Sequence, residues 1–195
     1  MNLISEIFHW KFGPIVAIAL GMTSGMVAGG LFIRSRNKRL GPLYQAALVG
    51  SVESVARCIE DGANIDAMSP SGFTALHVAT LNGHTPVVDQ LLQARAKVDM
   101  KNVKGNTPLH CAAEKGFCTI AEALIRHGAK VDARGSCGET PLHIAAINGQ
   151  EDVVKLLIEN GATTDIADDA GWTPEKCAES GGHSSVAELI RRGEI

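Results

Sequence analysis

The segment Gly138-Glu-Thr-Pro-Leu-His-Ile-Ala-Ala-Ile-Asn-Gly149 decides the fold, because close copies of it recur at a fixed period. Copies begin at Gly72 and Gly105, in steps of 33 residues, and a degenerate copy begins at Gly171. A period of this length is the signature of an array of repeated helical units. In each copy the threonine and the residue after it predict the start of a helix, and the final glycine predicts its end.

A second short helix is predicted in each unit, after the glycine that ends the first. Apolar residues at helical spacing, such as Val153 and Leu157, predict that one face of this helix is buried. Gly161 then predicts a left-handed residue that closes the helix, whereas Arg95 stands at the same place in an earlier unit. Because one unit cannot bury its apolar face alone, we expect the units to stack.

The motif Gly-x-Thr-Pro-Leu-His-x-Ala-Ala-x-x-Gly resembles the ankyrin repeat, and the resemblance runs from about Arg39 to Gly193. It implies an all-α repeat solenoid over residues 40–195, built from paired antiparallel helices with projecting hairpin loops. It also implies that the motif histidines bond to the backbone and to the motif threonine. Five units are expected, at about 39–71, 72–104, 105–137, 138–170 and 171–193.

Composition restricts the class of partner and the chemistry. Residues 40–195 carry 13 basic and 20 acidic side chains, whereas nucleic-acid binding needs a basic face, so no nucleic-acid partner is expected. The five cysteines are odd in number and contain no Cys-x-x-Cys pair, which predicts free thiols without a zinc site. No nucleophile with a base, pair of opposed carboxylates or Gly-rich phosphate loop interrupts the repeat, so we expect no catalytic residue, metal or cofactor.

The N-terminal region predicts a membrane anchor ahead of the repeats. Residues 12–33 contain no charged side chain, and a helix from Pro14 onward would span about 30 Å, the thickness of the bilayer core. We therefore expect a short N-terminal segment at 1–11, one transmembrane helix at 12–33 and a basic linker at 34–39. Four basic residues follow the span, so the repeats should face the cytosol.

A cleaved signal peptide is the alternative to this anchor. It would make the protein an exported ankyrin binding module, secreted or periplasmic, that could be accessory to an enzyme. Inside the span, Gly21, Gly25 and Gly29 recur at every fourth residue. Small residues at this spacing lie on one helix face and let a second helix approach, so self-association is expected there, although membrane helices also show such spacing by chance.

The resemblance implies that a partner binds at the hairpin tips and on the inner face of the first helix of each unit. Phe73, Leu81, Ile147 and Trp172 are apolar where the repeat does not demand it, which makes them candidate anchors for a partner. Binding is the favoured interpretation for Leu81 and Ile147, whereas the alternative for Trp172 is that it covers the last repeat, and for Phe73 that it packs locally. The full set of candidate protein-binding residues is Phe73, Leu81, Asn82, Lys104, Asn106, Glu114, Lys115, Glu139, Ile147, Asn148 and Trp172.

These observations together predict a non-enzymatic adaptor or scaffold that is tethered to a membrane and binds a protein of unknown identity. The acidic repeats favour a basic segment of that partner by charge complementarity.

Overall fold

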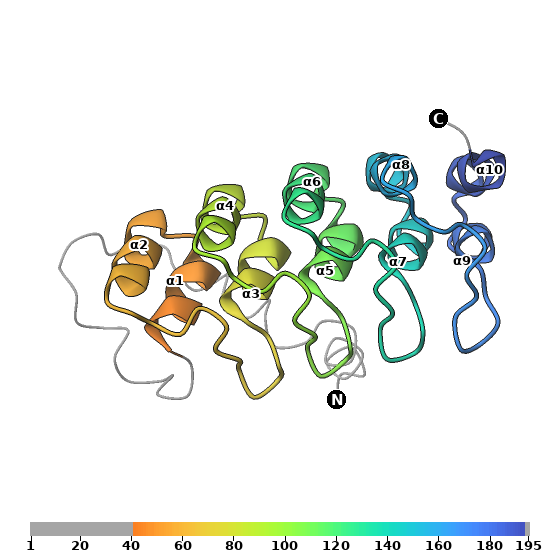
Figure 1. Ribbon diagram of the computed structural model, residues 1–195. Coiled ribbons are helices and arrows are strands. Elements are labelled where there is room, and N and C mark those ends of the chain that lie inside the picture. The colour runs from red at the N-terminus through yellow and green to blue at the C-terminus, as the bar shows by residue number, and fades with distance from the viewer. Residues whose placement is uncertain (1–40, 194–195) are drawn as a thin grey trace, which may run out of the picture. The chain divides into compact units, whose positions relative to one another are not determined.

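The computed structural model describes residues 41–193, which fold into ten short helices that lie side by side (Figure 1). The odd-numbered helices form one layer and the even-numbered helices form the other (Figure 1). This part of the chain contains no strand. In chain order the helices are α1 (Pro42–Val49), α2 (Val52–Glu60), α3 (Ala75–Leu81), α4 (Thr85–Gln93), α5 (Pro108–Lys115), α6 (Cys118–Arg126), α7 (Pro141–Ile147), α8 (Glu151–Glu159), α9 (Pro174–Ser180) and α10 (Ser184–Arg192).

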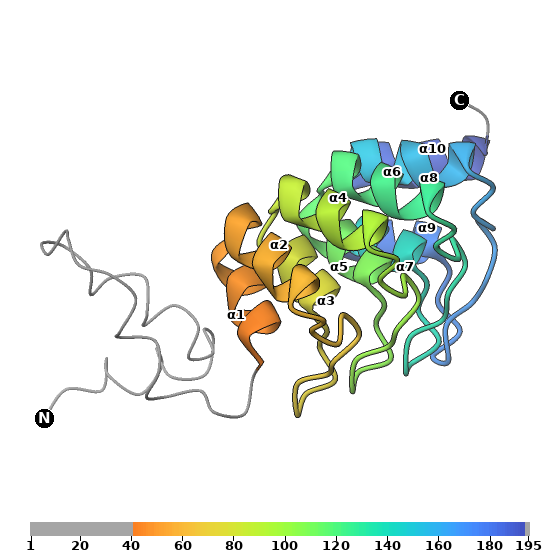
Figure 2. The same ribbon diagram turned by 60° about the vertical axis from the view of Figure 1, so that its left-hand side comes forward.

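Each unit contributes one helix to each layer, and a hairpin loop leads to the next unit. Figure 2 shows that these hairpins project from the same side of the odd-numbered layer. The all-helical repeat fold expected from the sequence is confirmed. The expected transmembrane helix, with its glycine face, lies outside the described residues; within residues 41–193 no helix is long and apolar enough to cross a membrane.

The motif threonine and histidine start the first helix of a unit and also join it to the next unit. The Thr74 hydroxyl accepts the His77 N–H at 3.4 Å, while the Thr74 N–H donates to Nδ1 of His77 at 3.2 Å. Nε2 of the same ring donates to the carbonyl oxygen of Asn106, in the next hairpin, at 3.0 Å. Because Nδ1 accepts and Nε2 donates, the ring is neutral. The structural role expected for these histidines therefore agrees with the geometry, which His110 and His143 repeat.

Small residues allow the layers to pack closely. Leu76, Leu109 and Leu142 occupy the same place in successive units and are fully buried. Alanines follow them in each first helix and have no exposed surface at Ala79 or Ala112, so neighbouring helix backbones can approach. One continuous apolar core results, and it runs through all the units described.

Aspartates in the loops make a further bond between units. A carboxylate oxygen of Asp66 accepts the Lys97 N–H at 2.9 Å, and Asp99 accepts the Lys130 N–H at 3.0 Å. Asp132 repeats the bond with the N–H of Thr163 at 3.0 Å. Each of these hydrogen bonds joins residues 31 positions apart, so it holds one loop against the next.

Arg95 takes the left-handed conformation that the sequence predicts, with φ +64°. Among residues 41–193 it is the only non-glycine residue with a positive φ. Gly62, Gly128 and Gly161 hold the same place in other units, with φ values of +77°, +88° and +82°. The turn therefore demands this conformation whatever residue occupies it.

Candidate functional site

Two positions at the end of each first helix lie free of the packing between units. We call the residues at these positions in the first four units the first-helix strip: Leu48, Val49, Leu81, Asn82, Glu114, Lys115, Ile147 and Asn148. Each pair directly precedes the glycine that ends or follows the helix, and it directly follows the buried small residues of that helix. Val49 is 68 %, Ile147 43 % and Leu48 40 % exposed, whereas Leu81 is half-buried. Apolar groups thus reach solvent in the first and fourth units.

Polar members of the strip differ in how free they are to bind a partner. The amide groups of Asn82 and Asn148 donate to the carbonyl oxygens of Val78 and Ile144, at 2.7 and 2.8 Å, and so complete their own helices. Glu114 and Lys115 form an exposed ion pair with a nitrogen–oxygen distance of 2.8 Å. A partner would therefore meet apolar groups at both ends of the strip and a neutralised pair of charges between them.

Several hairpin candidates also have structural roles. The Phe73 ring is half-buried and packs edge-on against His77, with 5.6 Å between ring centroids. The Asn106 carbonyl oxygen accepts from His77, and the Glu139 carboxylate accepts the Cys137 N–H at 2.9 Å. These contacts hold the hairpins in shape, and they leave less of the Phe73 and Glu139 side chains for a partner.

Lys104 and Trp172 remain the most accessible of the predicted hairpin residues. The Lys104 side chain is exposed at its hairpin tip. Trp172 is 42 % exposed, and its backbone carbonyl oxygen accepts from Nε2 of His143 at 3.0 Å. The backbone of Trp172 thus belongs to the repeat, whereas part of its indole ring is available for binding.

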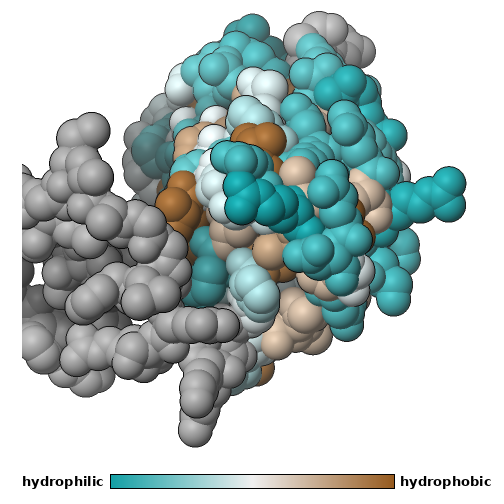
Figure 3. Space-filling view, turned by 90° about the vertical axis from the view of Figure 1, so that its left-hand side faces the viewer, coloured by the Kyte–Doolittle hydropathy of each residue, from teal (hydrophilic) through white to brown (hydrophobic). Residues whose placement is uncertain are grey.

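The candidate set missed exposed apolar residues in the first unit. Val52 and Met68 are exposed there, as are Leu48 and Val49 of the strip. Figure 3 views this end of the array and shows hydrophobic side chains among hydrophilic ones. A signal was present in the sequence, because Val52 stands where later units have Thr85, Cys118 and Glu151.

Burial shifts the pKa values of titratable groups inside the array toward their neutral forms. Burial lowers the pKa of His77, His110 and His143, although their backbone hydrogen bonds act in the opposite direction. Burial raises the pKa of the Cys111 thiol to about 12, which disfavours the thiolate that a nucleophile needs. The five cysteines are free thiols. Residues 41–193 contain no group of three or more potential ligands that could hold a metal ion.

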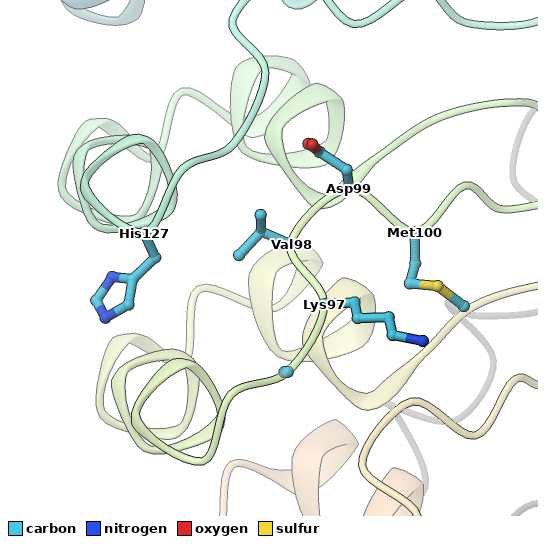
Figure 4. A pocket seen from close by; sticks show the side chains of 6 residues that line it. Lys97, Val98, Asp99, Met100 and His127 are labelled. Atoms are coloured by element: carbon cyan, nitrogen blue, oxygen red, sulfur yellow. The ribbon is translucent and has the colours of Figure 1, made fainter.

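One open groove lies between the loops of the second and third units (Figure 4). It encloses about 460 Å³, and its polar groups are already engaged: Asp99 accepts the Lys130 N–H, and His127 donates to the Ala123 carbonyl oxygen at 2.9 Å. The side chains of Lys97 and His127 do not converge on a common point (Figure 4). The groove is lined by Ala96, Lys97, Val98, Asp99, Met100 and His127.

Comparison with known proteins agrees with this architecture. The family model for ankyrin repeats (3 copies) matches residues 43–135 and 131–195, which together make up most of the chain. No curated protein matches the chain. Arrays of this kind are protein–protein interaction modules, which suits an exposed strip of mixed apolar and charged groups on a rigid stack. From these matches and the repeated Thr–His geometry, the chain belongs to the ankyrin repeat family.

Proposed function

We propose that this protein is a non-enzymatic adaptor, held at a membrane by a helix at residues 12–33, whose repeats bind a partner protein in the cytosol. The partner contacts the first-helix strip and the hairpin tips. Glycines at 21, 25 and 29 give the anchor a face for association with a second helix. The acidic repeats favour a partner with a basic segment.

The observation that carries the binding part of this proposal is the exposure of Leu48, Val49 and Ile147. These side chains contribute little to the core, since alanines and leucines on the other helix faces fill it. Exposed aliphatic groups that share one strip of a rigid surface are typical of the anchors that dominate protein interfaces. The strip also lies on helices, so its side chains are held in place before a partner arrives.

The membrane part of the proposal is supported by the sequence. The uncharged run at 12–33 has the length of a bilayer-spanning helix, and the basic residues Arg34, Arg36, Lys38 and Arg39 follow it at once. Basic flanks stay on the cytoplasmic side, so the repeats that follow them face the cytosol in this proposal.

A double substitution, Val49→Asp with Ile147→Asp, tests the binding surface. We expect it to leave the helical content unchanged, because both side chains are exposed, and to abolish partner binding, because a buried carboxylate would replace each apolar contact. The control, Thr119→Asp with Ser185→Asp, adds the same charge at exposed positions in the first turns of α6 and α10.

The measurement is proximity labelling in cells with a biotin ligase fused after Ile195. Proteins labelled by the unmodified chain and by the control, but lost with the double variant, are partners of the strip. If all three chains label the same proteins, the strip is not the binding surface. A fall in helicity of the double variant, seen by circular dichroism, would instead place these residues in the core.

Protease protection on sealed membrane vesicles tests the anchor and its orientation. With a tag after Ile195, the proposal requires that the protein resists alkaline extraction and that the tag is digested from the cytosolic side. A protected tag, or a shortened protein that is released by alkali, would replace the cytosolic adaptor with the exported binding module.

A further inference from the structure

Backbone hydrogen bonds join the hairpins of neighbouring units. The Val103 N–H donates to the Ser71 carbonyl oxygen at 3.2 Å, and Ser136 donates to Lys104 at 3.1 Å. Asp169 makes the third such bond, to Cys137 at 3.0 Å. The second and third hairpins therefore each donate one N–H to the hairpin before them and accept one N–H from the hairpin after them.

These backbone bonds form a ladder along the hairpins. Together with the aspartate and histidine bonds described above, they define which donors and acceptors a hairpin needs in order to dock on the unit before it. In the hairpin that begins at Lys97, the N–H of that residue donates to Asp66 and the N–H of Val103 donates to Ser71. The carbonyl oxygen of Asn106 accepts from His77. The docking segment thus carries donors at positions i and i+6 and an acceptor at i+9, and the next two hairpins repeat this spacing.

The first hairpin lacks the donor at this ladder position. Pro70 stands where Val103, Ser136 and Asp169 donate, and proline has no backbone N–H. A proline at the edge of a hydrogen-bonded array prevents a further segment from pairing there. The edge of the array at the first unit is therefore closed at this position.

The last unit keeps two of the three groups that receive a docking hairpin, since Lys176 stands where His77, His110 and His143 donate. The Ala170 carbonyl oxygen corresponds to the acceptors in Ser71, Lys104 and Cys137, and within residues 41–193 no donor reaches it. The Asp165 carboxylate corresponds to Asp66, Asp99 and Asp132 and has no donor in the same range. Both residues are exposed, as is the Trp172 ring on the same hairpin.

We propose that Asp165, Ala170 and Trp172 form a docking edge that binds an extended, basic segment of a partner protein, which adds one more hairpin to the array. Two of the three hydrogen bonds that hold the second, third and fourth hairpins in place, to the aspartate and to the ladder carbonyl, would form again with the partner's backbone, as when an extended peptide adds to a sheet edge.

Charge identifies the class of segment that fits this edge. Residues 163–172 include Asp165, Asp168 and Asp169 and no basic side chain, although Asp169 already pairs with Arg134 of the preceding hairpin at 3.5 Å. A lysine or arginine on the incoming segment gains from these carboxylates and can lie against the exposed ring of Trp172. An acidic segment would be repelled at the same place. This edge is distinct from the first-helix strip, so it goes beyond the function proposed above.

A cyclised peptide with the sequence of residues 97–106 is the probe. It contains the two donors at the required spacing and is basic, with Lys97, Lys101 and Lys104 against Asp99. Fluorescence anisotropy of the labelled peptide, with the full chain in neutral detergent micelles, measures its affinity. The matched control peptide carries Val103→Pro, which removes the i+6 donor as Pro70 does in the first hairpin.

On the protein, Asp165→Ala should weaken binding of the peptide about tenfold, the usual effect of losing a hydrogen bond to a charged group. Glu122→Ala removes the same charge from the exposed face of α6 and should leave the affinity unchanged. The Val103→Pro peptide should bind several-fold more weakly than its parent. Failure of the parent peptide to bind, or equal binding by both peptides or by the Asp165→Ala chain, would overturn the docking edge. The strip variant Val49→Asp/Ile147→Asp should bind the peptide normally, so the two proposals can fail independently.

Discussion

Replacing Arg95 by glycine should increase the free energy of unfolding, because the residue is held at φ +64°. A side chain in this left-handed conformation costs about 1–2 kcal/mol relative to glycine. Glycine gives back about 0.4–1 kcal/mol, since it makes the unfolded chain more flexible. The exposed Arg95 side chain makes no hydrogen bond or ion pair with residues 41–193, so nothing else is lost. With both estimates at their midpoints, the net gain is about 0.8 kcal/mol.

Thermal unfolding followed by circular dichroism at the helix signal measures this effect on the full chain in detergent. A gain of that size raises the melting temperature by about 1–4 °C in a domain of this length. Arg95→Ala is the matched control, because it removes the same charge but keeps a Cβ atom in the left-handed conformation. An unchanged or lower melting temperature for Arg95→Gly would refute the reasoning, as would an equal gain with Arg95→Ala.

Two further predictions concern buried polar groups. The hydroxyl of Thr80 is buried without a hydrogen-bond partner in residues 41–193, whereas three other units have alanine there (Ala47, Ala113 and Ala146), so Thr80→Ala should raise the free energy of unfolding by about 1 kcal/mol in urea titrations; a loss of stability would show that the hydroxyl is satisfied. Burial lowers the pKa of His77, His110 and His143, so the unfolded chain binds protons more readily than the folded one. Stability should therefore be complete above about pH 6.5 and fall as the pH drops below it, in urea titrations from pH 7.5 to 5.5, and His143→Asn should reduce that slope.

The sequence predicts the fold well because its strongest signals are local. Thr140 and Pro141 identify a helix start, and a glycine at a fixed distance identifies its end. The first helix of that unit runs over Pro141–Ile147, since proline fits the first turn and the helix continues to the residue before Asn148. Arg95 could be predicted to be left-handed because the period places it on a glycine position.

The binding surface is predicted less completely, because the repeat pattern marks only the residues that pack units together. Positions outside the pattern are not needed to pack the units together. Even so, Phe73 packs on His77, and the Glu139 carboxylate accepts a hydrogen bond within its own hairpin. Thr85 and Glu151 at the place of Val52 in later units were the available signal, but Val52 and Met68 were missed since an apolar residue on its own gives the same signal whether it is buried or exposed. Three-dimensional contacts were needed to separate these cases.

The hairpin bonds could not be predicted either, because they join backbone atoms and leave no trace in residue type except at proline. Pro70 is that exception, and its meaning appears only when the N–H groups of Val103, Ser136 and Asp169 are seen to donate to the hairpin before them. The two ends of the array therefore differ. The first unit has no N–H to donate at the ladder position, whereas the last described unit has a carbonyl oxygen there that no donor reaches within residues 41–193. Neighbouring helices stack at about 8–10 Å, so a segment bound at Ala170 would lie several repeats away from the first unit. An adaptor built this way presents its first-helix strip along its length and keeps a second docking edge at the end remote from the first unit.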